Sequence, residues 1–348
     1  ILNSLAITPD AMENKQIEKN YTSNLAAYEK YLLGRTQMTT RNAKGLRNAI
    51  SLFADAVMED AGFAPAYVGL ADAYSLLNLY DIEPPPDAYA LAKGFADRAL
   101  AIDPDLAEAH ASLAYIKFYY ERDRSAAELE FRRAVQMNPS YAQAHHWFAL
   151  ALAAMNKPVD ALSEIETAER LDPRSLSIKA ASAIVRFFGG DLDQGIADAD
   201  RALAIDPAFV PAHKVKRWIY AAKGDLEAAR ASFLLERQYS GGGPADPGWQ
   251  VIEAQIADTA EPARSEALRM LEAAISAPGV KGNDFAYAYE IALAFAHLGE
   301  KKRSLDYLER SERAGTHGFN LLEPEPRLAN LRKEPRFQDL LRKLRKDR

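Results

Sequence analysis

Apolar residues recur along most of the chain at intervals of three and four, the spacing of an amphipathic helix. Between residues 107 and 137, the large side chains of Leu113 and Phe131 alternate with small ones such as Ala127 and Ala134. Alanine is a strong helix former, and its small side chain allows two helices to approach closely. The pattern therefore predicts a helical chain in which neighbouring helices pack tightly.

Four similar turns interrupt this pattern at a nearly constant interval. They are centred on Pro104, Pro139, Pro173 and Pro207, which lie 35, 34 and 34 residues apart. A helix is expected to end before each proline, because proline disfavours helical geometry in the preceding residue and lacks the N–H needed to continue the helix. Aspartates at three of the turns are expected to stabilise the start of the next helix by capping: Asp103, Asp172 and Asp206.

The spacing is similar to that of the tetratricopeptide repeat (TPR), a 34-residue unit of two antiparallel helices. One unit matches the TPR consensus places with Leu113-Ala114, Ala127, Phe131, Ala134 and Pro139. The next unit repeats the series with Ala161, Ile165, Ala168 and Pro173. The resemblance implies an all-α fold, a TPR-type α-solenoid in which antiparallel helix pairs form a right-handed superhelix.

The pattern divides the chain into four parts. Residues 1–20 are expected to be the end of a preceding domain or a linker, 21–239 the TPR array, 240–248 a Gly/Pro linker, and 249–348 degenerate TPR-like helices with a basic capping helix. The proline-rich stretch 81–87 is expected to be an inserted loop. Lys216-Arg217 replaces the Leu-Gly of the consensus, which puts the packing of that repeat in doubt.

A more specific resemblance covers most of the chain. Several segments resemble the TPR half of a bacterial signalling family, in which it follows a class III adenylate cyclase domain or a winged-helix DNA-binding domain. These segments are AAYEKYLLGRTQM, APAYVGLADAYSLL, HWFALALAAMNKPVDAL and LANLRKEPRFQDLLRKL. The opening ILNSLAITPD resembles the last helix of the domain that precedes it. Since the first residue is Ile1, the chain is expected to be a piece of a longer or processed protein.

Composition narrows the possible functions. The chain has no cysteine, which excludes disulfides and thiolate chemistry and fits a reducing, cytoplasmic compartment. Apolar stretches such as Phe148–Met155 are far shorter than the roughly 20 residues of a membrane span. A net charge of −6 argues mildly against nucleic acid as a partner. Residues 327–348 carry a local excess of positive charge, but the apolar face of Leu340, Leu341 and Leu344 favours a docked capping helix over a nucleic-acid or membrane contact.

No pattern of residues points to catalysis. His110, His145 and His213 fall at the same place in different repeats, at least one repeat apart, which is too far to share a metal ion. Phosphate-binding loops, dinucleotide fingerprints and nucleophile motifs are missing from the sequence. We therefore expect no catalytic residue, no metal and no cofactor. An enzyme or a small-molecule sensor with an unrecognised site is the alternative.

The resemblance to TPR domains implies binding along the first helix of each repeat, which lines the concave groove of the solenoid. Aromatic and polar residues there suit an extended or helical peptide. The candidates are Tyr115, Phe118, Tyr119, His146, Phe187, Lys214, Trp218 and Tyr289. Packing of these aromatics between repeats is the competing interpretation.

The most direct functional hypothesis is a non-catalytic protein–protein interaction and regulatory module that binds a protein or peptide. TPR domains that hold chaperone C-termini use Lys/Asn clamps, whereas the matching positions here are Ala111, Tyr115, His146 and Leu150. That class of partner is therefore not expected. A self-association scaffold, which would form a homo-oligomer, is a further alternative.

Overall fold

The computed structural model describes residues 21–80, 85, 87–241, 246–277, 287–314 and 317–346. Within these ranges all regular secondary structure is helical and no strand is present. The segment predicted as the end of a preceding domain, 1–20, lies outside the described residues. So do most of the inserted loop at 81–87 and positions 242–245 of the predicted linker.

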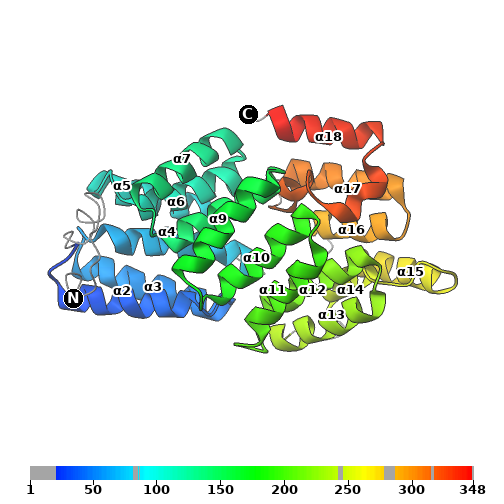
Figure 1. Ribbon diagram of the computed structural model, residues 1–348, viewed down its shortest axis with the longest axis horizontal. Helices are drawn as coiled ribbons and strands as arrows, with labels where there is room; N and C mark the ends of the chain where they lie inside the picture. The colour runs from blue at the N-terminus through cyan, green and yellow to red at the C-terminus, as the bar shows by residue number, and fades with distance from the viewer. Residues whose placement is uncertain are drawn as a thin grey trace. The chain divides into compact units, whose positions relative to one another are not determined.

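The chain divides into two compact units, 1–148 and 149–348, which we call unit 1 and unit 2. In unit 1, consecutive helices pack as antiparallel pairs (Figure 1). The pairs are α2 (Leu25–Met38) with α3 (Ala43–Glu59), α4 (Ala64–Tyr80) with α5 (Ala88–Ile102), and α6 (Ala107–Ile116) with α7 (Arg124–Met137). A π-helical turn, η2 (Lys117–Glu121), extends α6, and unit 1 ends within α8 (Ala142–Ala154).

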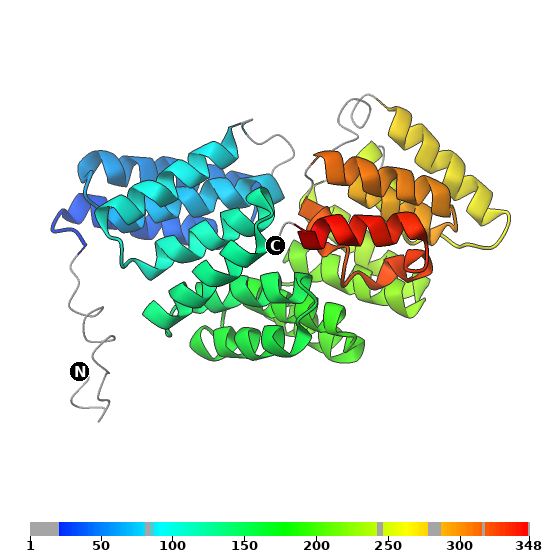
Figure 2. The ribbon, with the colours of Figure 1, turned by 90° about the horizontal axis from the view of Figure 1, so that it is seen from above.

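Unit 2 also consists of consecutive helices that pack in pairs, and its last three helices, α16 to α18, lie side by side in Figure 2. Its helices are α9 (Pro158–Leu171), α10 (Leu176–Gly189), α11 (Leu192–Leu203), α12 (Val210–Lys223), α13 (Leu226–Ser240), α14 (Pro247–Ala254), α15 (Ala263–Ser276), α16 (Ala288–His297) and α17 (Lys301–Ala314). After them come η3 (His317–Leu321), η4 (Pro326–Leu331) and α18 (Pro335–Lys346). The predicted fold class, an all-α array of TPR-type helix pairs, is confirmed.

Within the described parts of the chain, four pairs of successive first helices contact one another directly. In unit 1, α2 packs on α4 and α4 on α6; in unit 2, α10 packs on α12 and α14 on α16. Successive second helices make no comparable contact among the described residues. We call the side formed by α2, α4, α6 and residues 142–148 the first-helix face of unit 1, and the side formed by α10, α12, α14 and α16 the first-helix face of unit 2.

Two glycines allow this close approach in unit 1. Gly34 on α2 and Gly69 on α4 both lie against the buried ring of Phe53 on α3. A Cβ atom at either position would come within 2.6 Å of that ring. Since carbon atoms in contact are normally about 3.5–4.0 Å apart, the packing requires glycine at both positions.

The turn aspartates act differently from the sequence-based expectation. Asp103 and Asp172 are the C-caps of α5 and α9, and their carboxylates accept from the N–H two residues ahead, as does that of Asp206. The prediction that they cap the following helices is wrong. Their side chains complete Asx turns instead, and the N-cap positions of the following helices fall three residues later, at Leu106, Ser175 and Phe209.

The three equivalent histidines close their own turns. In each case Nε2 lies within hydrogen-bond distance of the carbonyl oxygen of the proline six residues earlier: His110 to Pro104 at 3.1 Å, His145 to Pro139 at 3.0 Å, and His213 to Pro207 at 2.8 Å. In the remaining turn the ammonium group of Lys179 donates to the equivalent carbonyl oxygen, that of Pro173. A positively charged donor replaces the imidazole there, so these histidines have a structural role.

Candidate functional site

Three of the four candidate residues in unit 1 are buried, with Tyr115 4%, His146 5% and Phe118 0% exposed, whereas Tyr119 is partly exposed. Tyr115 on α6 packs against Tyr119 and Trp147, with ring centroids 4.5 and 4.8 Å apart. Phe118 is 0% exposed and lies beneath the guanidinium of Arg124 at 5.9 Å. It belongs to the core of the π-helical turn, because it leaves no surface for a partner to contact.

Polar groups of α4, α6 and α8, together with Arg41 in the turn after α2, form hydrogen bonds with one another in unit 1. The Nη2 atom of Arg41, which follows α2, donates to Oε1 of Gln143 on α8 at 3.3 Å. Nε2 of Gln143 lies 3.4 Å from Nδ1 of His146, one of the predicted residues. On the neighbouring helices, the Ser112 hydroxyl of α6 donates a short hydrogen bond to the carboxylate of Asp72 on α4. Arg41 therefore connects the turn between the two helices of the first repeat with the start of α8.

Two buried residues of this face, Asp72 and His146, have pKa values far from their ordinary ones. Burial raises the pKa of Asp72 to about 7, although the Ser112 hydrogen bond and the guanidinium groups of Arg41 and Arg35 act to lower it. Burial, together with the nearby charge of Arg41, lowers the pKa of His146 to about 3. At neutral pH this histidine is therefore uncharged, and Asp72 retains a proton far more readily than an ordinary carboxylate does.

Tyrosines complete the surroundings of these charges. Nη1 of Arg35 on α2 donates to the hydroxyl of Tyr31 at 3.3 Å, and Arg35 itself is exposed. Burial, and then the negative charges of Asp72 and Glu108, raise the pKa of Tyr141 well above its ordinary value. Nε of Arg41 and the hydroxyl of Ser75 are buried and have no hydrogen-bond partner among the described residues.

The four candidates in unit 2 lie around one side chain from the C-terminal segment. The guanidinium of Arg327, in η4, lies 5.0 Å from the ring centroid of Trp218 and 5.8 Å from that of Phe187. Lys214 stands 5.3 Å from the Trp218 ring. The Tyr289 hydroxyl donates to Oε2 of Glu325 at 3.3 Å. The structure thus brings these four predicted residues together, against the chain's own residues 325–327.

Behind this cluster, a buried polar network supports α12. Arg217, at the position where the consensus has glycine, donates through Nε to Glu236 of α13 at 2.8 Å. Its Nη1 reaches Oε1 of Gln255 at 3.4 Å, and Nε2 of Gln255 donates to the carboxylate of Glu290 at 2.7 Å. The doubt about this repeat is resolved by Glu236, which neutralises the buried arginine and allows α12 and α13 to pack as a regular pair.

Burial alone would raise the pKa of Glu290. The positive charges of Lys214, Arg327 and Arg217, together with the Gln255 hydrogen bond, outweigh it and lower the pKa below its ordinary value. Glu290 is therefore ionised at neutral pH and leaves a negative charge beside Trp218 and Arg327.

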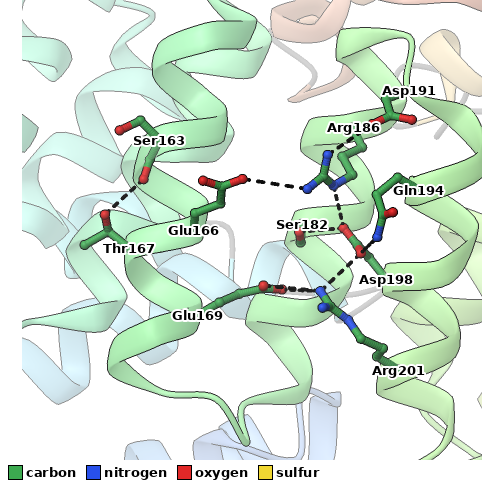
Figure 3. Close-up of polar contacts among 10 residues, drawn as sticks. All are labelled: Ser163, Glu166, Thr167, Glu169, Ser182, Arg186, Asp191, Gln194, Asp198 and Arg201. Carbon is green, nitrogen blue, oxygen red and sulfur yellow. Dashed lines mark hydrogen bonds and ion pairs between the residues drawn. The ribbon is translucent and has the colours of Figure 1, made fainter.

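A second buried carboxylate in unit 2, that of Asp198, is surrounded by hydrogen-bond donors from α10 and from its own helix, α11 (Figure 3). Asp198 on α11 is 0% exposed and accepts from the Ser182 hydroxyl at 2.7 Å, Nε of Arg186 at 2.9 Å and Nε2 of Gln194 at 2.9 Å. Arg201 adds an ion pair to Asp198 at 3.1 Å and also binds Glu169 of α9. Because donors surround this carboxylate, the network joins α9, α10 and α11 and is structural.

Sequence reasoning predicted Lys214 but missed the other charged residues of both faces, among them Asp72 and Arg327. Asp72 had a usable signal, since it is a lone carboxylate within the apolar stretch from Val68 to Leu77. Arg327 had none, because it was grouped with the basic tail. The described residues contain no cluster of His, Asp and Glu able to hold a metal ion, and none of their helices is long and apolar enough to cross a membrane.

No family model matches the chain, and no curated protein matches it. Among solved structures it is similar to a thermophilic TPR protein from Thermus thermophilus, with 22% identity over 52% of this chain and 92% of the other, and a TM-score of 0.43. It is also similar to PilW, a type IV pilus biogenesis factor, with 20% identity over 64% and 96% of the two chains and a TM-score of 0.45. It is similar as well to PilF of Pseudomonas aeruginosa, with 17% identity over 63% of this chain and 98% of the other, and a TM-score of 0.41. The assignment of this chain to the TPR-type fold rests on its own helix pairs and 34-residue period.

Proposed function

We propose that the chain is a non-catalytic protein-interaction module, and that the first-helix face of unit 1 binds a peptide segment of a protein partner. The observation that carries this proposal is the convergence of polar and aromatic side chains from four first helices: Tyr31, Arg35, Asp72, Ser112, Tyr115 and His146. These residues lie close enough for charges on one helix to shift the pKa of groups on others.

Hydrogen-bonding capacity supports a peptide as the ligand. Nε of Arg41 and the hydroxyl of Ser75 have no partner among the described residues, and buried polar groups are normally paired. A peptide backbone offers a carbonyl acceptor at each residue and an N–H donor at nearly every one. Arg35 is exposed on the same face and provides a positive charge for an acidic side chain of the partner.

The experiment compares two cationic residues on one helix. Proteins retained by the immobilised chain are identified, and the affinity of each is measured for the wild type, Arg35→Ala and Lys30→Ala. Lys30 is the matched control, because it also lies on α2 but pairs with Glu59 of α3 at 2.7 Å. We expect Arg35→Ala to weaken binding about ten-fold or more, and Lys30→Ala to leave it within about two-fold. Equal effects of the two changes would contradict binding at this face.

A small-molecule sensor is the second candidate, and the perturbed pKa values of Asp72 and His146 favour it. Strongly shifted titratable groups concentrate at ligand-binding sites. The test is a thermal-shift screen of metabolites against the wild type and Asp72→Asn. A compound that raises the unfolding temperature of the wild type but not of the variant would support this candidate over a peptide ligand.

The resemblance of several segments to the TPR half of bacterial cyclases and winged-helix regulators favours a place in signalling. We propose that the module regulates an output domain of one of these two kinds. The coding sequence upstream of Ile1 tests this directly. A cyclase or winged-helix signature there would support the proposal, and an unrelated domain would exclude it.

A further inference from the structure

The Arg327 side chain is held in the manner in which proteins recognise arginine. Its Nε and Nη2 atoms each donate to one carboxylate oxygen of Glu325 at 2.7 Å. Its guanidinium group also lies near the rings of Trp218 and Phe187. A bidentate carboxylate and aromatic rings within about 6 Å together suit a planar guanidinium and fit the ammonium group of lysine poorly.

The surroundings of this arginine are anchored independently of it. Leu328 and Leu331 are fully buried in a core shared with α16, α17 and α18, and the Asn330 side chain donates to the carbonyl of Ala296 at 2.9 Å. The Glu325 carboxylate is 0% exposed and accepts from Tyr289. Glu325 and the aromatic rings therefore have their own attachments to the fold, and a site for a guanidinium remains when the Arg327 side chain leaves.

The Arg327 side chain is 10% exposed and makes one long hydrogen bond outside its own segment, 3.4 Å from Nη1 to Oε1 of Gln255, the C-cap of α14. Its shorter hydrogen bonds are with Glu325 of its own segment. In addition, Trp218 is only 8% exposed, and its buried Nε1 finds no acceptor among the residues that the structure describes. A peptide that placed its arginine here would bring backbone carbonyls that can accept from this N–H.

We propose that the first-helix face of unit 2 carries an arginine-recognition site, and that an arginine side chain of a partner peptide takes the place of Arg327 in it. The ionised Glu290 and the Glu325 carboxylate supply the negative charge for the incoming guanidinium. Lys214, beside Trp218, repels a strongly basic peptide. The partner segment therefore has an isolated arginine next to neutral or acidic residues, as in the chain's own Glu325-Pro326-Arg327.

The test removes the internal competitor. N-acetyl-arginine amide and N-acetyl-lysine amide are titrated into the full chain and into Arg327→Ala, with binding followed by tryptophan fluorescence and calorimetry. We expect Arg327→Ala to bind the arginine compound at least ten-fold more tightly than the lysine compound. It should also bind it at least ten-fold more tightly than the wild type does, because Arg327 competes in the wild type. The wild type should still saturate at higher concentration.

Two variants complete the test. Trp218→Phe in the Arg327→Ala background should abolish the fluorescence change and weaken binding. Arg327→Met, which keeps the aliphatic stem, replaces Arg327→Ala if the alanine variant loses its helical circular dichroism. A folded variant without saturable binding, equal binding of the two compounds, or a wild type that never binds the arginine compound would each overturn the proposal. Because these measurements use no unit 1 partner, their outcome is independent of the function proposed for unit 1.

Discussion

The Arg41 guanidinium donates to the side-chain carbonyl of Gln143 at 3.3 Å, although 102 residues separate them in the chain. Arg41 has a left-handed backbone, with φ of 49°, directly after α2. Its positive charge acts on two titratable groups of the same face, and in both cases it lowers the pKa. Arg41 thus couples the geometry of the first-helix face of unit 1 to its protonation.

The first prediction follows from this coupling. Arg41→Ala should raise the pKa of Asp72 above its present value of about 7 and the pKa of His146 above about 3, because a nearby positive charge is removed from both. Titration by NMR of the Asp72 carboxyl carbon and the His146 ring measures both. The exposed Lys44 on α3 is the control, and Lys44→Ala should shift neither group. Unchanged values in Arg41→Ala would show that the charge of Arg41 does not act on these groups.

The second prediction concerns the pH dependence of stability. Burial raises the pKa of Asp72 to about 7, against about 3.9 in an unfolded chain, so the native state binds the extra proton. The resulting loss of stability is absent below about pH 4 and complete above about pH 7. Acidification from pH 8 to pH 5 should therefore raise the free energy of unfolding by roughly 2–3 kcal/mol through protonation of Asp72.

His146 acts in the opposite direction in the same range. Burial lowers its pKa to about 3, against about 6.5 when unfolded, so below pH 6.5 only the unfolded chain takes up the proton. The stability contributed by the neutral imidazole is lost as the pH falls, by roughly 2 kcal/mol between pH 8 and pH 5. Urea unfolding at pH 5, 6.5 and 8 separates the two groups. Asp72→Asn should lose stability on acidification relative to the wild type, and His146→Gln should gain it; a parallel response of all three chains would contradict the assignment.

The helix pairs were predictable because their signals are local. The spacing of Pro104, Pro139, Pro173 and Pro207, and the apolar period between them, depends only on neighbouring residues. The contacts of Arg327 were not predictable in this way. Its aromatic neighbours Phe187 and Trp218 lie more than a hundred residues earlier in the chain. Only the packing of η4 against α12 and α16 brings them together.

The candidate binding residues illustrate the same limit. Helical spacing placed Tyr115 and Phe118 on one helix, but it did not show that the π-helical turn at 117–121 would direct Phe118 into the core. Nor did it reveal the polar partners of Asp72, since Ser112 and Arg41 come from other repeats. A pattern along one helix predicts which residues share a face, whereas the charge environment of that face depends on three neighbouring helices.

The third prediction tests the glycine contacts of Phe53. Gly69→Ala should destabilise the chain by about 1–3 kcal/mol, because the new Cβ would lie 2.6 Å from a ring that is fully buried. Gly94 is the matched control: it lies within α5, and a Cβ there meets nothing within 4 Å. Gly94→Ala should stabilise by up to about 1 kcal/mol, since alanine is the better helix former. Thermal and urea unfolding measure both changes, and a neutral Gly69→Ala would show that Phe53 has room to move.

The fourth prediction concerns the carboxylate of Asp198, which joins three helices of unit 2 (Figure 3). Asp198→Ala removes the acceptor of the buried Ser182 hydroxyl and of the Gln194 amide, and it leaves Arg186 without its closest carboxylate. Arg186 and Arg201 retain ion pairs with Asp191 and Glu169 and can turn toward water, which limits the loss to about 2–3 kcal/mol.

Asp193, on the same helix, provides the comparison for Asp198. Its side chain is 87% exposed and pairs with Lys223, so Asp193→Ala should change the free energy of unfolding by less than about 0.5 kcal/mol. Hydrogen exchange of the amides of α9, α10 and α11 locates the effect: protection should fall in all three helices of Asp198→Ala and in none of Asp193→Ala. Loss confined to α11 would mean that the ion pairs to α9, from Arg201 to Glu169 and from Arg186 to Glu166, hold α9 in place without Asp198.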